Sequence, residues 1–324
     1  GEGLADGNAA LARAYENYLI SKRLMPYDYW GISNNDTTLT EKAVSIASDP
    51  KVSSYAIYEP AASVAAAEES LRASLTKLIE KNIELADSGS DVDLFSKAYI
   101  YLGKMIDEPR NEERYTLVNE VTAMLDGLLA ELAPMLDAYP ALQTSFLSIK
   151  HLVTGPDPMD KTYAFINAQD YGDVAMIGDS YAYCPQYQWL NTEAQRQRYA
   201  DQEQLWWYGC NHPVNPYPGF SFNSPLMTSR VLGWMMYDYD IDGLLYWCVN
   251  HWGSYEGGIQ LKDYWNTYSA FPGEGILILP GSDYGVTGPI GTIRIENIRE
   301  SLEDYEYLWL LEQFTGSDAA AATY

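Results

Sequence analysis

The sequence has few cysteines, and this scarcity limits the kinds of site it can build. Only Cys184, Cys210 and Cys248 occur in 324 residues. They are too few and too scattered for a disulfide framework, and no C-x-x-C or cysteine–histidine spacing typical of zinc is present. We therefore expect buried thiols, with no metal and no cofactor.

Basic residues are also scarce. The chain has 20 Lys and Arg against 45 Asp and Glu, a formal net charge of −25. Such a charge repels phosphate backbones and anionic membrane surfaces. We expect no nucleic-acid partner.

Long apolar runs are missing as well. No stretch approaches the length of a membrane span, and the first residues lack the basic-then-apolar pattern of a signal peptide. We expect no membrane span. The missing signal does not exclude export, and the expected location is secreted or cell-envelope.

What the sequence does have is a substantial core and many polar aromatic rings. Hydrophobic residues make up 47% of the chain, and 28 Tyr and 9 Trp stand against only 7 Phe. Such rings pack on one side and hydrogen-bond on the other, and carbohydrate sites use them because sugar C–H faces stack on them. More than half of them are expected simply to pack helices against strands.

Strand-like apolar runs alternate with helical patterns along most of the chain. The expected strands are residues 25–30, 54–58, 98–106, 146–153, 174–178, 205–208 and 243–247. The expected helices between and before them are residues 8–23, 61–87, 114–136, 192–204 and 224–237. This alternation predicts an α/β fold with a parallel sheet, and seven such units favour a closed (β/α)8 TIM-type barrel.

The pattern changes after the last of these strands. Residues 274–296 read as a β-hairpin built from the runs 276–281 and 291–295, and residues 299–314 read as an amphipathic helix. We expect one barrel domain over residues 1–315, including this hairpin and helix, and a frayed tail over residues 316–324.

Two adjacent carboxylates, Asp107 and Glu108, follow the apolar run at residues 99–106. Glycosidic cleavage needs one carboxylic acid to protonate the leaving oxygen and a second group to stabilise or attack the anomeric carbon. Because Pro109 cannot donate to a sheet, the strand is expected to end there, so both side chains can turn toward the barrel mouth. An isolated Asp-Glu-Pro is usually a solvated turn, but its place after a central strand favours a catalytic pair.

Aromatic and amide side chains gather at the ends of the last two predicted strands and suggest a sugar pocket. The candidate contacts in this cluster are Trp206, Trp207, Tyr208, Trp247, Asn250 and Trp252. Asn250 and Trp252, which lie beyond the strand, are the favoured ligand contacts, and core packing accounts for some of the other rings. Weaker candidates at other strand ends are Tyr27, Trp30, His151, Asp179 and Tyr181. His151 fits a neutral, hydrogen-bonded barrel histidine equally well.

Several motifs in a fixed order resemble the catalytic domain of glycoside hydrolase family 123 over roughly residues 10–312. They are Met105-Ile-Asp-Glu-Pro109, Trp207-Tyr-Gly-Cys210, Arg230-Val-Leu-Gly-Trp234, Asp242-Gly-Leu-Leu-Tyr-Trp247 and the segment from Arg294 to Leu308. Glu303 and Asp304, in the last of these, are interpreted as structural residues that pack the final helix.

The resemblance implies a retaining, substrate-assisted β-N-acetylgalactosaminidase acting on glycans. In that scheme the acetamido oxygen of the substrate attacks the anomeric carbon, Asp107 orients the acetamido N–H, and Glu108 acts as acid and then as base. It also implies a departure, because the family carries its Asp-Glu pair on the fourth strand and here the pair falls on the third. We therefore expect the first barrel strand, and the β-sandwich domain that commonly precedes the barrel, to be missing from this chain.

Two other functions remain open from the sequence. One is a glycosidase with a different sugar specificity, and the other is a non-catalytic carbohydrate-binding barrel.

Overall fold

The computed structural model describes residues 9–26, 38–57, 63–155, 176, 178–213, 216–252 and 271–315, and for Ala9 and Lys104 it describes the backbone alone. The chain divides into two units, one formed by Gly1–Leu24 with Gln186–Tyr324 and the other by Met25–Pro185. In the part of the chain that the structure describes, no helix is long and apolar enough to cross a membrane.

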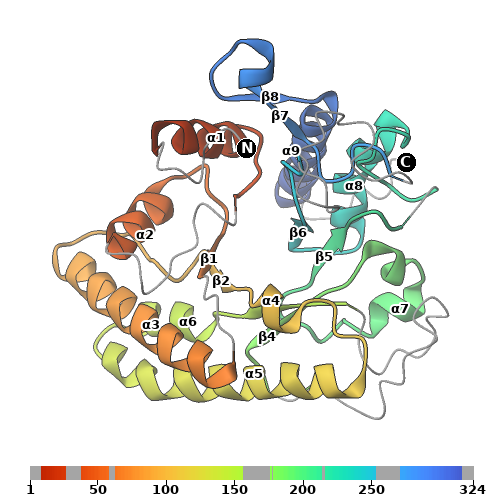
Figure 1. The fold of residues 1–324 in the computed structure, drawn as a ribbon. Helices are drawn as coiled ribbons and strands as arrows, with labels where there is room; N and C mark the ends of the chain where they lie inside the picture. The colour runs from red at the N-terminus through yellow and green to blue at the C-terminus, as the bar shows by residue number, and fades with distance from the viewer. Residues whose placement is uncertain are drawn as a thin grey trace. The chain divides into compact units, whose positions relative to one another are not determined.

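The unit of residues 25–185 contains a four-stranded parallel sheet (Figure 1). Its strands, in spatial and chain order, are β1 (Tyr55–Ile57), β2 (Ala98–Ile100), β3 (His151–Thr154) and β4 (Tyr181–Cys184). Strands β1 and β3 are buried along their whole length. Burial of this kind is typical of parallel sheets covered by helices, and the predicted α/β fold is confirmed.

Described helices of this unit lie before β1, between β1 and β2, and between β2 and β3. They are α2 (Leu39–Ser48), α3 (Val64–Asp87), α4 (Gly103–Ile106), α5 (Glu112–Leu132), the 3-10 helix η2 (Ala133–Leu136) and α6 (Pro140–Leu147). The long helices α3 and α5 lie side by side (Figure 1). Each begins at a polar cap, since Ser63 and Asn111 accept a hydrogen bond from the backbone of Ala66 and Arg114 respectively.

The other unit contains two short sheets. Strands β5 (Trp206–Gly209) and β6 (Gly243–Tyr246) pair in parallel, whereas β7 (Ile278–Pro280) and β8 (Pro289–Gly291) pair antiparallel. A hairpin thus lies within the predicted residues 274–296, but the predicted second strand, residues 291–295, is wrong because helix α9 begins at Ile293. The helices of this unit are α1 (Ala9–Ser21), η4 (Tyr187–Leu190), α7 (Glu193–Gln197), α8 (Leu226–Asp238), η5 (Gly281–Tyr284) and α9 (Ile293–Thr315).

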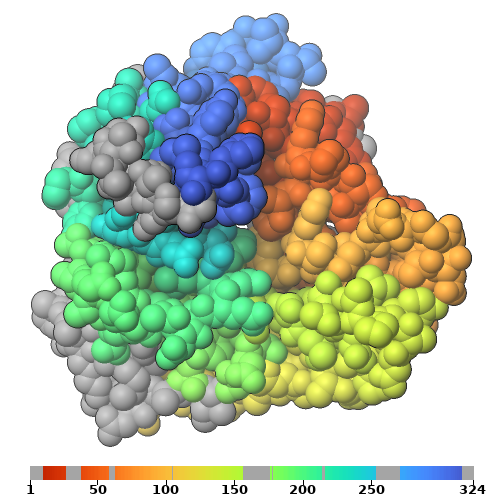
Figure 2. Space-filling view, turned by 180° about the vertical axis from the view of Figure 1, so that it is seen from behind, coloured from red at the N-terminus to blue at the C-terminus, as the bar shows by residue number. Residues whose placement is uncertain are grey.

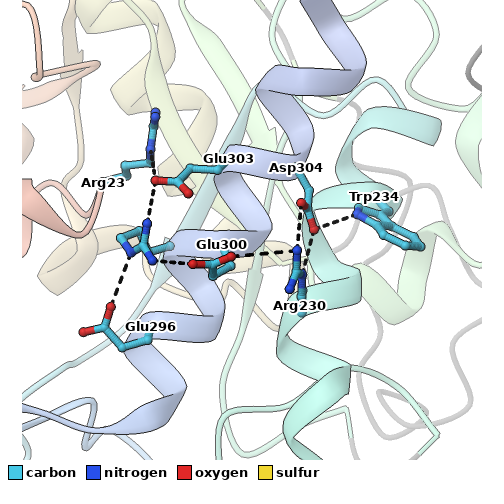
Figure 3. Close-up of polar contacts among 8 residues, drawn as sticks. Arg23, Arg230, Trp234, Glu296, Glu300, Glu303 and Asp304 are labelled. Atoms are coloured by element: carbon cyan, nitrogen blue, oxygen red, sulfur yellow. Dashed lines mark hydrogen bonds and ion pairs between the residues drawn. The ribbon is translucent and has the colours of Figure 1, made fainter. Parts of the chain in front are cut away.

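Helices α8 and α9 pack closely because small residues and ion pairs line their contact. The backbone N–H of Gly233 donates to Ser301 Oγ at 2.6 Å. Arg230 binds Asp304 through Nε at 2.9 Å and Nη2 at 3.1 Å, and Trp234 donates its indole N–H to the same carboxylate at 3.0 Å (Figure 3). Two of the family-like motifs therefore meet at this helix pair, which supports the structural interpretation of Asp304.

The outer side of α9 carries further ion pairs and exposed rings. Arg23, next to the end of α1, forms an ion pair with Glu303 at 3.5 Å (Figure 3). Figure 2 shows the C-terminal half of α9, in dark blue, on the molecular surface. Tyr307 and Phe314 of this helix are exposed.

Several predicted boundaries are wrong. The run 98–106 is a strand only to Ile100, because the chain reverses into the helical turn α4. Residues 146–147 belong to α6, so β3 begins at His151. The strand predicted at residues 174–178 falls mostly outside the described residues, and β4 begins at Tyr181. Helix α9 begins at Ile293 rather than at residue 299, because Ile295 and Ile298 bury one helical face. The strand predicted at residues 25–30 lies mainly outside the described residues.

Candidate functional site

The Asp107 side chain lies at the carboxyl edge of the four-stranded sheet. Asp107 closes the helical turn α4, where its N–H donates to Gly103 O at 2.9 Å. Its Oδ1 accepts two hydrogen bonds, from the hydroxyl of Tyr101 at 2.8 Å and from Thr154 Oγ1 at 3.0 Å. Thr154 is the last residue of β3. The pair therefore follows a turn next to β3 and not, as expected, the end of a strand.

The second oxygen of Asp107 is not held in this way. Among the described residues no donor bonds to Oδ2, and the side chain is exposed. One oxygen is thus anchored by two hydroxyl groups while the other remains available to a polar group of a ligand. Fixing a carboxylate in this way removes the entropy of its rotation before a ligand arrives.

Glu108 has an unusual backbone conformation. Its φ angle is +41°, in the left-handed region that costs a non-glycine residue on the order of 1 kcal/mol. The N–H of Glu108 donates to Thr154 Oγ1 at 2.8 Å, so the same hydroxyl that holds Asp107 also holds this strained residue. The Glu108 carboxylate forms an ion pair with Arg110. Strained residues of this kind cluster at functional sites.

The charge on Asp107 affects buried groups around it. Burial raises the pKa of the Tyr101 hydroxyl, and the charge of Asp107 with their hydrogen bond raises it further. Burial, with the charge of Asp107 as a second cause, also raises the pKa of the Cys184 thiol, which ends β4. Both groups are therefore neutral at physiological pH, so Tyr101 is a stable donor to the carboxylate.

His151 lies at the opposite end of β3 from Thr154 and is fully buried. Its Nε2 is 2.8 Å from the hydroxyl of Thr122, whose proton goes to Val118 O, so Nε2 is the donor in this pair. Burial lowers the pKa of His151 to about 4, and the charge of Asp126 partly opposes this. The structure thus favours the neutral, hydrogen-bonded alternative for His151 over a substrate contact.

Asp179 and Tyr181 also lie at the amino edge of the sheet. Tyr181 is the first residue of β4 and pairs in register with His151. The backbone O of Asp179 accepts from Lys150 Nζ at 2.9 Å, just before the strand. The expectation that these residues follow a strand is wrong because β4 begins several residues later than predicted. In the described residues they are not brought together with Asp107.

The four tryptophans predicted to line the sugar pocket do not all have exposed rings. They are Trp206, Trp207, Trp247 and Trp252. Trp207 is fully buried and packs edge-on against Tyr187 and Tyr239, and Tyr208 is buried beside it. Trp206 opens β5, where its ring covers Gly243. Core packing therefore explains Trp207 and Tyr208, and Trp206 lies at the amino end of its strand.

The segment after β6 contains the other predicted contacts. Trp252 is buried, donates its indole N–H to Ile278 O at 2.8 Å and packs against Tyr15. This corrects its expected role as a ligand contact, because Asn250 and His251 pair with the chain leading into β7 and the Trp252 ring that follows them lies in the core. Asn250 is partly exposed and bridges to Ile276. Trp247, directly after β6, is partly exposed at the carboxyl end of the strand.

Four residues that form hydrogen bonds around Asp107 and Trp247 were not predicted from the sequence. Tyr101 and Thr154 hold Asp107, and Tyr246 and Trp247 donate to Glu274 at 3.1 and 3.0 Å. The missed residues are Tyr101, Thr154, Tyr246 and Glu274. Tyr101, Thr154 and Tyr246 stand at or just after strand ends, a signal that was available, whereas Glu274 lies in a glycine-rich loop with no such signal.

Tyr27 and Trp30 lie outside the described residues. Within the described ranges, no group of three or more His, Cys, Asp or Glu side chains could hold a metal ion.

Comparison with known proteins points to one family. None of the curated proteins matches the sequence. Among solved structures, a family 123 glycoside hydrolase from Clostridium perfringens, studied for glycolipid glycan hydrolysis, resembles the chain with a TM-score of 0.43 and 15% identity. That match covers 79% of this chain and 37% of the other, so the chain spans well under half the length of this relative.

The family model for the catalytic domain of glycoside hydrolase 123 matches residues 100–311, which include the Asp107-Glu108 pair, strands β3–β8 and the α8–α9 helix pair. The match covers more than half of the chain, and the chain belongs to glycoside hydrolase family 123.

Proposed function

We propose that this chain is a retaining, substrate-assisted β-N-acetylhexosaminidase, with β-N-acetylgalactosaminides as its preferred substrates. Asp107 and Glu108 carry the chemistry. The observation that carries the proposal is the asymmetric anchoring of Asp107, whose Oδ1 is held by Tyr101 and Thr154 while Oδ2 has no donor among the described residues. Membership of family 123 supports the same assignment.

In the first step the substrate supplies its own nucleophile. The acetamido oxygen attacks the anomeric carbon, the bond to the leaving oxygen breaks, and Glu108 donates a proton to that oxygen. Positive charge develops on the acetamido group as its oxygen forms the new bond. Asp107 Oδ2 accepts the acetamido N–H and stabilises this charge, since Oδ1 is already occupied.

In the second step water opens the cyclised intermediate. Glu108, now ionised, takes a proton from the water, which attacks the anomeric carbon and releases the acetamido oxygen. Two inversions at one carbon give net retention. An ordinary retaining enzyme needs two carboxyl groups facing each other about 5 Å apart, whereas this route needs no enzymic nucleophile and is compatible with neighbouring residues.

The ion pair between Glu108 and Arg110 belongs to the resting state in this scheme. A general acid must hold a proton, so the exposed Arg110 guanidinium has to leave the carboxylate when substrate binds. Arg110 lies two residues from Glu108, and its side chain is 64% exposed.

The proposal includes an architecture. We propose that the parallel strands β1 to β4 are part of a (β/α)8 barrel. Their chain order and their alternation with helices support this, as does the place of Asp107 at the carboxyl edge of its sheet. A crystal structure with a thiazoline mimic of the cyclised intermediate tests the architecture together with the site.

The catalytic roles are separated by changing the leaving group. A general acid matters most for poor leaving groups, so Glu108→Gln should nearly abolish cleavage of natural linkages and spare much of the first step on an activated aryl glycoside. Asp107→Asn should not be rescued in this way, because a better leaving group cannot replace a stabilising contact to the acetamido group.

Three other outcomes would change the assignment. If Glu108→Gln lowered the rate of cleavage equally for the natural linkage and the activated aryl glycoside, Glu108 would not be the general acid. If the chain cleaved only aryl glycosides of another sugar, it would be a glycosidase of different specificity. Equilibrium binding of N-acetylgalactosamine without product release by the wild-type chain would favour a non-catalytic carbohydrate-binding protein.

A further inference from the structure

A second buried carboxylate, Glu274, lies at the carboxyl end of β6. Its side chain is 1% exposed. Its Oε1 accepts two hydrogen bonds, one from the hydroxyl of Tyr246 at 3.1 Å and one from the indole N–H of Trp247 at 3.0 Å. The Tyr246 hydroxyl in turn accepts the N–H of Gly275 at 2.8 Å. Adjacent residues at the end of one strand thus converge on one carboxylate oxygen.

Burying this carboxyl group is costly. Burial raises the pKa of Glu274, and the hydrogen bonds from Trp247 and Tyr246 oppose that rise only in part. Across the described residues no Lys or Arg forms an ion pair with Glu274. An apolar side chain would fill the same space without this penalty, so packing alone does not account for a glutamate here.

The hydrogen bond to Glu274 is one of several contacts that the described residues make with the Trp247 indole. The ring of His251 lies 5.1 Å from the indole ring. On another side the indole meets Gly275, where a Cβ atom would stand 2.7 Å from its Cζ2, so only glycine permits this approach. Gly275 also has a φ angle of +73°, which favours glycine on backbone grounds. The indole is therefore held on several sides while part of it stays exposed.

A fixed, partly exposed indole at a strand's carboxyl end is suited to stacking on a sugar. Sugar C–H faces bind aromatic rings through dispersion and the ring quadrupole, and a rigid ring loses little entropy when it binds. We propose that Glu274 is a positioning residue that holds the Trp247 indole as a stacking surface for a pyranose ring of the glycan. This inference rests on the proposed function.

Substitutions at Glu274 separate positioning from packing. In Glu274→Gln the amide oxygen can still accept both hydrogen bonds, so KM for an aryl N-acetylgalactosaminide should stay within about twofold of wild type. Glu274→Met fills the space without an acceptor and should raise KM about tenfold with a much smaller change in kcat. Glu274→Asp, which withdraws the acceptor by one methylene, should raise KM about threefold.

The coupling to Trp247 is tested with a double variant. Trp247→Ala should raise KM at least tenfold, and adding Glu274→Met to it should raise KM no further, because the surface to be positioned is gone. The matched control is Asp242→Asn. Asp242 is a carboxylate next to the other end of β6 whose pKa is raised by burial, and it accepts the N–H of Leu205 at 2.8 Å. This control should leave KM unchanged.

A wild-type KM in folded Glu274→Met would overturn the inference, and so would independent, additive effects in the double variant. If Glu274→Met does not fold, an unchanged KM in Glu274→Asp would overturn it. If the wild-type chain cleaves no 2-acetamido glycoside, the proposed enzyme activity fails, and binding of N-acetylgalactosamine by calorimetry replaces KM. Equal affinity in wild type and Glu274→Met would then overturn the inference, and absence of binding by wild type would overturn both.

Discussion

At the scale of single residues, the proposed mechanism depends on how Asp107 is held. Its carboxylate has one oxygen bound by two hydroxyl groups, and one of these, from Thr154, also receives the N–H of Glu108. A single threonine at the end of β3 therefore sets the positions of both proposed catalytic residues. The geometry of the pair is determined by its neighbours and not by the pair alone.

Tyr101→Phe should therefore lower kcat on an aryl N-acetylgalactosaminide about tenfold, with little change in KM. A hydrogen bond to a charged group contributes about 1.5–3 kcal/mol, and part of this is lost when Asp107 can rotate away from the acetamido group. The matched control is Tyr139→Phe, since Tyr139 donates to Asp87 at 2.6 Å in an equivalent tyrosine–carboxylate pair elsewhere on the surface. Equal kinetics in the two variants would show that Tyr101 does not position Asp107.

His151 links stability to pH. Its pKa is lowered by burial from 6.5 to about 4, so the unfolded chain binds a proton at this residue before the folded chain does. The stabilisation is complete above pH 6.5 and is lost as the pH falls toward 4, by roughly 3 kcal/mol over the whole window. Urea unfolding at pH 7 and pH 4.5 should show a larger loss of unfolding free energy in wild type than in His151→Gln. The same loss in both proteins would contradict a buried neutral histidine.

The Asp107-Glu108 pair could be singled out from the sequence as two adjacent carboxylates before a proline, but the predicted strand end was wrong, because the turn α4 separates the pair from β2. Tyr101 and Thr154 stand at strand ends, which the sequence could indicate, but their hydrogen bonds to Asp107 depend on the helical turn α4 and could not be predicted. Trp207 and Trp252 show the opposite error. Their residue type suits a sugar site, but only the fold shows that both rings point into the core.

At the scale of elements, the α8–α9 pair depends on one glycine. A Cβ at Gly233 would collide with the backbone carbonyl of Ser301, which cannot move without shifting α9. Gly233→Ala should therefore destabilise the protein by about 1–3 kcal/mol, the usual cost of overpacking. Denaturant unfolding measures this change.

The matched control for Gly233 is Gly127, which lies within α5 and has no neighbouring atom within 4 Å of the position that a Cβ would take. Gly127→Ala should be neutral or stabilise the protein by up to about 1 kcal/mol, because alanine has the higher helix propensity. If both substitutions had the same effect, close helix packing at Gly233 would not be the cause.

Long elements were predictable from the sequence and short ones were not. Helices α3, α5 and α8 lie close to their predicted bounds, because their apolar spacing extends over several turns. The strands have only three or four residues each, so a single turn of helix such as α4 changes where a functional side chain falls. Asp179 and Tyr181 were expected at the carboxyl edge of the sheet, and they lie at its amino edge because the short strand β4 begins later than predicted.

At the scale of the whole molecule, composition limits the kind of substrate, and the proposed reaction rests on membership of the family. A net charge of −25 disfavours polyanionic partners, and a neutral glycan is compatible with it. The family match over residues 100–311 places the chain among glycoside hydrolases of family 123. The step from family to mechanism depends on whether the acetamido group of the substrate takes part in the reaction.

The most direct measurement compares two aryl glycosides that differ only at C2. The wild-type chain is assayed with an aryl β-N-acetylgalactosaminide and with the matching 2-hydroxy glycoside under the same conditions. If the acetamido oxygen is the nucleophile and Asp107 holds its N–H, the first compound is hydrolysed with retention, the second is inert, and a thiazoline mimic of the cyclised intermediate inhibits. Comparable turnover of the 2-hydroxy glycoside would contradict the mechanism even though it would establish glycosidase activity.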